Sequence, residues 1–439
     1  MTRHPPSAPP TAPPLTSGFT HGWLHALAAV VAGYAVMVVV AALGLWLAGA
    51  SELPQGAFLP VIAATVVMAV GGRVGLEGGA GTIARSDAAV TVFPLSVALA
   101  GALVTAYVVV RPLRRHAVVP GHRMLWLFVR TGVLWALVTL LIALGAHHTF
   151  TISTGEDFLG DLSDLLGVTP TVGFRADVPV TVVAGLLWLA VVLVLAFAVS
   201  RRAPLPSRLV PAHTVVRPAA RAMVGVLLAY VVAGAVIAVV TAFTRAEPAD
   251  GFAVVFLGLP NVAWLAFGLG MGASWHGDVQ GALGVPVPEA LASVLSGGDG
   301  DVTLDLGALS EYDGRAWWLV VAAAVAMLGA GWATARRAPP GTGHVRNAVH
   351  LALASAVAML LIGVLTRIDA HYGLSLFGIG DPSDTGGLGG SIVLLPNLLP
   401  AIGIAALWGF AAGLLGSMAA RLLPPARPAR PARGGVPAR

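Results

Sequence analysis

The stretch that decides the fold runs from residue 179 to residue 243: PVTVVAGLLWLAVVLVLAFAVS (179–200), RRAPLPSRLVPAHTVVRPAAR (201–221) and AMVGVLLAYVVAGAVIAVVTAF (222–243). Two apolar runs flank a linker that carries five arginines and no acidic residue. A membrane-crossing helix needs about 20 apolar residues. Cytoplasmic loops collect basic residues next to the helix ends. The pattern therefore predicts two crossing helices that are joined on the cytoplasmic side.

The rest of the chain has the same character. Of its 439 residues, 57% are hydrophobic and 10% are charged, whereas soluble domains are about 25% charged. Because so few charges cannot cover a water-facing surface, most of the exterior must face lipid. Cysteine is absent, which excludes disulfides, thiolate metal ligands and cysteine nucleophiles. We expect an all-α, polytopic membrane protein whose main partner is the lipid bilayer.

Ten apolar runs are candidates for membrane segments. Eight are long enough to cross: 23–49, 88–110, 124–146, 179–200, 219–243, 315–335, 347–367 and 391–420. Two others contain proline: residues 57–72 are short, and residues 252–273 carry Pro260 in the middle. The charges favour a re-entrant path for both, with the turn of the second at Leu259-Pro260-Asn261. A single kinked span over 252–273 is the alternative.

Charge predicts the orientation. Nineteen of the 25 basic residues, all of them arginine, and no acidic residue lie in the segments 1–22, 111–130, 201–221, 336–346 and 421–439. All 20 acidic residues lie in the remaining segments. This division is coherent if the eight clear runs cross and the two proline-containing runs do not. We therefore expect a plasma (inner) membrane protein with both termini in the cytoplasm.

The order of features recurs along the chain. Each half has a span, a proline-containing run, a glycine-rich outer loop, two spans joined by arginines, an acidic outer loop and a final span. Gly78–Gly81 matches Gly297–Gly300, and Arg114-Arg115 matches Arg336-Arg337. An even number of crossings in each half predicts two parallel repeats, related by an axis along the membrane normal. The expected division is a disordered end (1–20), repeat 1 (21–200), a basic linker (201–217), repeat 2 (218–423) and a disordered basic tail (424–439).

Prolines and neighbouring asparagines are the candidate helix-break or path residues. Proline removes a helical hydrogen bond, and asparagine can cap the backbone that follows it. A broken helix inside a membrane needs protein or water around it. The candidates are Pro60, Pro260, Asn261, Pro396 and Asn397. An ordinary proline kink is the alternative at each site.

Glycine spacing also predicts helix packing. Gly268 with Gly272, and Gly409 with Gly413, are four residues apart, a spacing that allows helices to approach closely.

Signals of chemistry are otherwise weak. The clear spans contain no carboxylate, and the chain has no HExxH, GxSxG or Walker A motif. His147 and His148 precede several acids, but residues 157–168 have the apolar spacing of an amphipathic surface helix. We therefore predict no catalytic residue, cofactor, metal ligand or nucleic-acid partner.

Three segments carry a family resemblance: FLGLPNVAWLAFGLGMGASW (256–275), GALGVPVPEALASVL (281–295) and LLPNLLPAIGIAALWGF (394–410). They resemble the streptophobe family, very hydrophobic multi-pass membrane proteins of streptomycetes, over roughly residues 20–423. The resemblance implies an integral membrane protein without an assigned activity, and it supplies no catalytic residues.

Three functional hypotheses remain open. The first is a permease- or channel-like protein with a path between its halves. The second is a non-transporting scaffold or partner of envelope or secretion machinery, either with another membrane protein or as a homo-oligomer. The third is an enzyme that acts on lipid or polyprenyl substrates from the outer loops. A water-filled centre between the halves would favour the first hypothesis, whereas a dry centre would favour the second.

Overall fold

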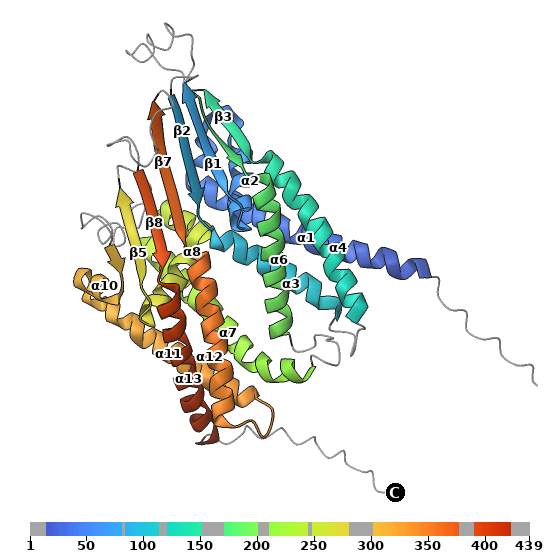
Figure 1. Ribbon diagram of the computed structural model, residues 1–439, viewed down its shortest axis with the longest axis vertical. Helices are drawn as coiled ribbons and strands as arrows, with labels where there is room; N and C mark the ends of the chain where they lie inside the picture. The colour runs from blue at the N-terminus through green and yellow to red at the C-terminus, as the bar shows by residue number, and fades with distance from the viewer. Residues whose placement is uncertain are drawn as a thin grey trace, which may run out of the picture.

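The computed structural model of the chain describes residues 15–80, 84–113, 121–151, 171–200, 210–244, 248–280, 302–376 and 390–422 (Figure 1). Over these ranges, eight helices are long and apolar enough to cross a membrane. Many of their Val and Leu side chains are exposed, which is stable only in lipid. The predicted helical, polytopic architecture is confirmed. The protein is an integral multi-pass membrane protein.

The helices have the following bounds: α1 (Leu15–Leu47), α2 (Phe58–Ala69), α3 (Leu95–Leu113), α4 (Gly121–Gly145), α6 (Val178–Val199), α7 (Val210–Thr244), α8 (Pro248–Gly270), α10 (Leu306–Tyr312), α11 (Trp318–Arg337), α12 (His344–Leu365) and α13 (Leu398–Leu422). Short 3-10 turns precede α2 (Ala50–Glu52 and Pro54–Gly56) and α11 (Gly314–Trp317). Helices satisfy their backbone groups internally, as a lipid environment requires.

A β-sheet that the sequence did not predict accompanies the helices. Its strands in the described residues are β1 (Val74–Ala80), β2 (Ala84–Thr91), β3 (His147–Thr151), β4 (Thr171–Ala176), β5 (Trp275–Gln280), β6 (Val302–Leu304), β7 (Ile368–Leu376) and β8 (Gly390–Pro396). They form one antiparallel sheet in the order β3-β4-β1-β2-β7-β8-β5-β6. The sheet is an addition to the predicted helical membrane part.

The base of the sheet packs on the helices through one of its faces. Neighbouring residues of a strand point to opposite faces. Val74 pairs with Ala176, so these two apolar residues share one face. Val74 and Ala176 form an apolar cluster with Val67 of α2 and Ala143 of α4. The burial of this pair fixes the register, because a slip by one residue would expose it.

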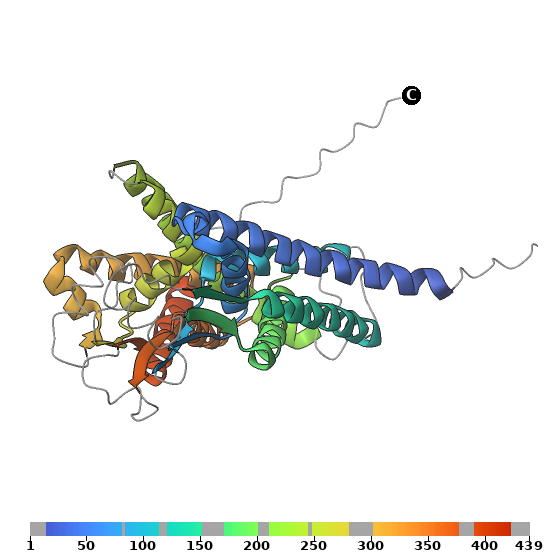
Figure 2. The ribbon, with the colours of Figure 1, turned by 90° about the horizontal axis from the view of Figure 1, so that it is seen from above.

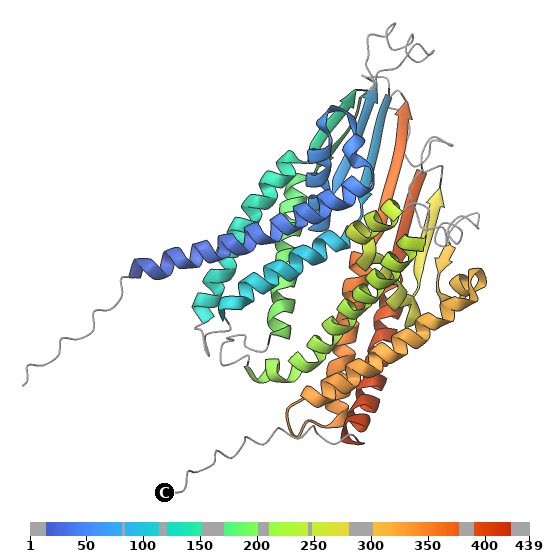
Figure 3. The ribbon, with the colours of Figure 1, turned by 180° about the vertical axis from the view of Figure 1, so that it is seen from behind.

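The strands gather at one end of the helices (Figure 3). Seen from above, α1 and the α7–α8 pair lie on the side of the molecule away from the sheet (Figure 2). The helix ends away from the sheet carry arginine. α3, α11 and α13 have arginine in their last turns, at Arg111, Arg336, Arg337 and Arg421. Acidic residues such as Asp177, Asp278 and Asp369 lie in or beside the strands.

Two predicted spans are partly strand, which corrects their boundaries. The run 88–110 begins in β2, and its helix starts only at Leu95. The run 391–420 begins in β8, and its helix starts at Leu398. In both cases an apolar strand leads directly into an apolar helix. Hydropathy alone cannot separate the two.

Other predicted boundaries also move. α1 begins at Leu15, inside the end expected to be disordered up to residue 20. α7 begins at Val210 and continues through Pro218, so it includes part of the predicted linker 201–217. The predicted surface helix 157–168, the glycines 297–300, Arg114-Arg115 and the tail 424–439 lie outside the described residues.

The order of elements recurs between residues 15–200, here called the N-terminal half, and residues 210–422, the C-terminal half. Each half gives the described order helix, helix, strand, strand, helix, helix, strand, strand, helix, apart from the added α10. Adding 220 to both residue numbers converts the pair His148–Phe174 into Ile368–Leu394. The pair Val74–Ala176 becomes Trp275–Pro396 with shifts of 201 and 220. Strand order and direction therefore agree between the halves.

The turn before the first strand of each half also recurs. α2 and α8 are each followed by a glycine with φ near 90°, Gly71 and Gly272. This left-handed conformation favours glycine. The next residue then donates its N–H back to the helix, from Gly72 to Val67 O at 2.9 Å and from Ala273 to Gly268 O at 3.0 Å.

Candidate functional site

The first candidate site is Pro260, and α8 runs through it without a break. The hairpin turn predicted at Leu259-Pro260-Asn261 is therefore absent, and the sequence interpretation was wrong here. α8 instead folds back along α7: Trp264 Nε1 donates to Leu227 O at 3.1 Å, and Gly251 lies against Ala242. A proline kink that neighbouring groups stabilise is the common alternative to a break in membrane helices.

A hydroxyl from the other half replaces part of the helical hydrogen bonding before Pro260. Ser96, in the first turn of α3, donates its Oγ–H to Val255 O at 2.7 Å. The same Oγ accepts the N–H of Leu259 at 3.2 Å. In an undisturbed helix, Leu259 N–H would bond directly to Val255 O. The Ser96 hydroxyl is thus inserted between this donor and its usual acceptor.

Asn261 makes the second polar contact between α8 and α3. Its Oδ1 accepts the N–H of Leu95 at 3.2 Å, and its Nδ2 donates to Phe93 O at 2.8 Å. Leu95 opens α3, where the first N–H groups have no partner within the helix. Asn261 therefore caps a helix of the N-terminal half from within a helix of the C-terminal half. We call Ser96, Asn261 and their partners the α3–α8 contact.

Pro396 and Asn397 mark a different feature, the junction between β8 and α13. Asn397 donates its backbone N–H to Ser274 O at 3.0 Å and its Nδ2–H to Ser274 Oγ at 2.9 Å. Asp177 has the corresponding place between β4 and α6, and its backbone N–H bonds to Arg73 O at 3.0 Å. These bonds tie the start of the last helix in each half to the start of the first strand.

Pro60 lies in the first turn of α2. Proline is tolerated there because the first N–H groups of a helix have no internal acceptor. Pro60 is also one residue closer to its turn glycine, Gly71, than Pro260 is to Gly272. The two prolines therefore differ by one position in their distance from the turn glycine. The five candidate residues belong to three separate junctions, and the structure does not bring them together.

The surroundings of the α3–α8 contact are apolar. One continuous core cluster joins buried side chains of α1, α3, α4 and α6 to those of α7, α8, α11, α12 and α13. Among the described residues, the buried polar side chains are Thr, Ser and Asn, and none is charged. The contact is thus a local polar link beside an apolar core.

A polar and aromatic cluster inside the N-terminal half was missed by the sequence analysis. Tyr34 Oη lies 2.6 Å from Thr139 Oγ1, and Thr139 donates to Trp135 O at 2.7 Å. The Trp135 ring stacks on Trp188 with centroids 5.1 Å apart. Trp135 Nε1 is buried and has no hydrogen-bond partner in the described part of the chain. The one available signal was the Trp135–Thr139 spacing of four residues within an apolar span.

The two adjacent histidines do not form a metal site with other described residues. They are neighbours in β3, so they point to opposite faces. His147 is exposed and donates from Nδ1 to Leu144 O at 2.8 Å, whereas the His148 ring packs against Phe150 and Phe174. Within the described ranges, no group of three His, Asp or Glu side chains has a geometry that suits a metal ion.

The sequence matches no protein-family profile, no curated protein and no solved structure.

Proposed function

We propose that the protein is a non-transporting component of the plasma membrane, a scaffold that presents its sheet to a partner outside the cell. The observation that carries this proposal is the continuous apolar core between the halves. A transport path needs polar or ionisable groups along it. The α3–α8 contact offers one hydroxyl, of Ser96, and one amide, of Asn261, and both are already bonded across the contact.

The arginines support the orientation in this proposal. Helix ends away from the sheet carry the basic residues, which the positive-inside rule assigns to the cytoplasm. Both termini then lie in the cytoplasm and the sheet lies outside. Recurrence of element order, strand order and register supports an origin by duplication of one parallel repeat. The resemblance to the streptophobe family, which implies an integral membrane protein, agrees with this proposal.

The sheet supports a role in binding a protein partner. In the described residues, β3 and β6 are its two outermost strands. An outermost strand has backbone N–H and C=O groups that another extended chain can pair with. A rigid sheet above a closed helical bundle suits a docking function better than a transport function.

Cysteine accessibility tests the proposal in this naturally cysteine-free chain. Four single variants are needed: Ser96→Cys in the α3–α8 contact, Ser355→Cys between α12 and α13, Glu311→Cys near the sheet and Val345→Cys at the opposite end. Each is treated with a membrane-impermeant maleimide, first on intact cells and then on permeabilised cells. We expect Glu311→Cys to react on intact cells and Val345→Cys only after permeabilisation.

The two core positions decide between scaffold and path. A dry core leaves both Ser96→Cys and Ser355→Cys unreactive under native conditions. Rapid reaction of Ser96→Cys alone, with Ser355→Cys protected, would reveal a water-filled path and contradict the scaffold. Reaction of Val345→Cys on intact cells would instead contradict the orientation.

A further inference from the structure

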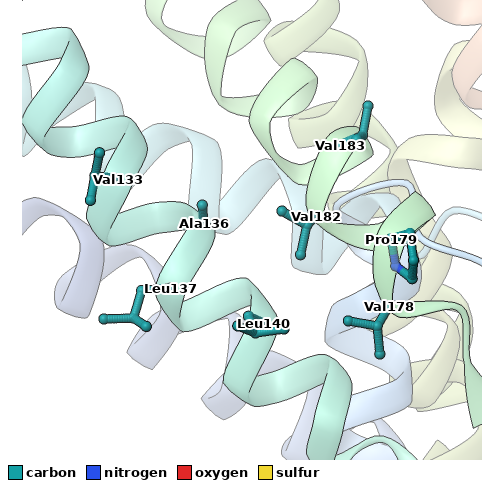
Figure 4. Close-up of a pocket in the computed structure, with 8 residues that line it drawn as sticks. All are labelled: Val133, Ala136, Leu137, Leu140, Val178, Pro179, Val182 and Val183. Carbon is teal, nitrogen blue, oxygen red and sulfur yellow. The ribbon is translucent and has the colours of Figure 1, made fainter.

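An apolar groove runs between α4 and α6 (Figure 4). Its volume is about 600 Å³. Side chains of α4 form one wall and side chains of α6 form the other, and all of them are aliphatic: Val133, Ala136, Leu137, Leu140, Val178, Pro179, Val182 and Val183.

The aromatic cluster accounts for the width of this groove. Trp135 of α4 and Trp188 of α6 stack between the two helices on the buried side. These large rings hold the helix axes apart, whereas small residues would let the backbones approach. On the outer side, only Val, Leu, Ala and Pro side chains face the remaining space. A groove is therefore left open on the surface.

The groove faces hydrocarbon. Leu137 is 51% exposed and Val183 is 69% exposed, and both lie within helices of membrane-spanning length. The walls contain no side-chain donor or acceptor, so they offer dispersion contacts alone. A flexible hydrocarbon chain is the occupant that suits such walls in a bilayer.

Two exposed basic residues lie in the strands that connect to the groove helices. Val178 and Pro179 open α6, and Arg175 precedes them in β4. Arg175 pairs directly with His147 of β3, so both point to the same face, and both are exposed. Asp177 is also close by, but its carboxylate caps α6 by accepting the N–H of Val180 at 3.1 Å.

We propose that the α4–α6 groove binds one acyl chain of an anionic phospholipid from the sheet-side leaflet, and that Arg175 and His147 hold its phosphate headgroup. Arginine donates two N–H groups to phosphate oxygens, and His147, whose Nδ1–H is bonded to Leu144 O, donates from Nε2 when its ring is protonated. The apolar groove and the basic pair are adjacent in the chain and in the fold, which suits an amphipathic ligand.

Native mass spectrometry of the purified chain tests this proposal, with added phosphatidylglycerol or phosphatidylcholine as probes. Arg175→Gln should weaken the binding of one phosphatidylglycerol about five-fold, in keeping with the effect of one basic residue on anionic lipid. It should leave the binding of phosphatidylcholine unchanged. Arg315→Gln, which removes another exposed arginine beside the sheet, serves as the charge control and should have no effect on either lipid.

Ala136→Phe fills the groove and should reduce the retention of both lipids. Val357→Phe places the same ring on the lipid-exposed face of α12 and should retain lipid as the natural chain does. Thermal unfolding checks that each variant is folded. Unchanged lipid retention in folded Ala136→Phe overturns the proposal. An equal loss of both lipids in Arg175→Gln also overturns the proposal. So does a natural chain that is a dimer and becomes a monomer in Ala136→Phe, because the groove would then bind a second copy of the chain.

Discussion

The helix pair α4–α6 of the N-terminal half and the pair α12–α13 of the C-terminal half have the same place in the recurring order, but they are packed in opposite ways. Aromatic rings separate the first pair: Trp135 contacts Trp188 and also Tyr34, at centroid distances of 5.1 and 4.3 Å. Glycines join the second pair: a Cβ at Gly409 would lie 2.7 Å from Leu351 O, and one at Gly413 would lie 2.5 Å from Ala348 Cα.

This difference shows that one arrangement of helices tolerates two kinds of interface in lipid. Lipid competes well for apolar side chains, so close backbone packing or specific polar contacts must hold the helices together. The C-terminal half uses backbone packing, as the spacing of Gly409 and Gly413 predicted. The N-terminal half uses rings and hydroxyls, and it retains a groove. Gly268 and Gly272 differ again, because Gly272 lies beyond the end of α8 in a left-handed turn.

The largest expected effect comes from adding bulk where a glycine lets a further helix, α11, approach α13 closely. A Cβ at Gly331 of α11 would overlap the carbonyl of Ala412 of α13. Gly331→Val should therefore force the two helices apart and destabilise the fold by about 3 kcal/mol or more. The measurement is an SDS titration of purified protein in detergent micelles.

Gly329→Val is the matched control, because a Cβ at Gly329 has no neighbour within 4 Å. Equal stability of the Gly331 and Gly329 variants would refute the glycine-packed interface.

Removal of a ring should have the next largest effect. Trp135 is fully buried, so Trp135→Ala should cost about 3–5 kcal/mol of unfolding free energy through lost contacts and a cavity. Trp126→Ala, in the exposed first part of the same helix, should cost under about 1 kcal/mol. The same titration compares them. Similar values for the two variants would show that the aromatic cluster does not hold α4 and α6.

The two asparagines compare a contact between the halves with one inside a half. Asn261→Leu leaves Leu95 N–H and Phe93 C=O without their partner, and should cost about 1–3 kcal/mol for each buried group. Asn397→Leu removes one side-chain bond to Ser274 and should cost about 1 kcal/mol. The SDS titration gives the loss of unfolding free energy for each variant. A larger loss for Asn397→Leu than for Asn261→Leu would contradict the role assigned to Asn261.

The smallest expected effect lies in the buried hydroxyl pair. Tyr34→Phe removes its hydrogen bond to Thr139 Oγ1, but Thr139 still donates to Trp135 O. The loss should be about 0.5–1.5 kcal/mol. A loss above that of Trp135→Ala would mean that hydroxyls, rather than rings, dominate this interface.

Much of the helical part could be predicted from the sequence, because long apolar runs and arginine-rich helix ends are strong signals. The sheet could not. The strand Gly390–Pro396 continues into an apolar helix, and Ala84–Thr91 is rich in small residues with weak strand preference. The clearest missed signal for a strand was the alternation of apolar residues with polar residues or glycine over Ile368–Leu376.

The candidate site was predicted in part. Asn261 was singled out as a residue that caps the backbone following it, whereas its side chain bonds to backbone groups at the start of α3. That partner could not be predicted, because Asn261 and Leu95 are distant in the sequence. Pro260 suggested a break because nothing in the sequence identified Ser96 as the hydroxyl that stabilises α8 there.

The central claim is that β2 and β7 join the two halves into one sheet, and a single cross-link tests it most directly. Thr91 pairs with Asp369 across these strands. Residues directly opposite in an antiparallel pair have Cα atoms about 4.5–5.5 Å apart, within the range of a disulfide. In the cysteine-free chain, the double variant Thr91→Cys/Asp369→Cys should therefore oxidise to an intramolecular disulfide.

The control Thr91→Cys/Ile368→Cys, whose side chains point to opposite faces, should not. Efficient oxidation of the first pair alone is the predicted result, whereas equal yields or no cross-link in the first pair would contradict the joined sheet.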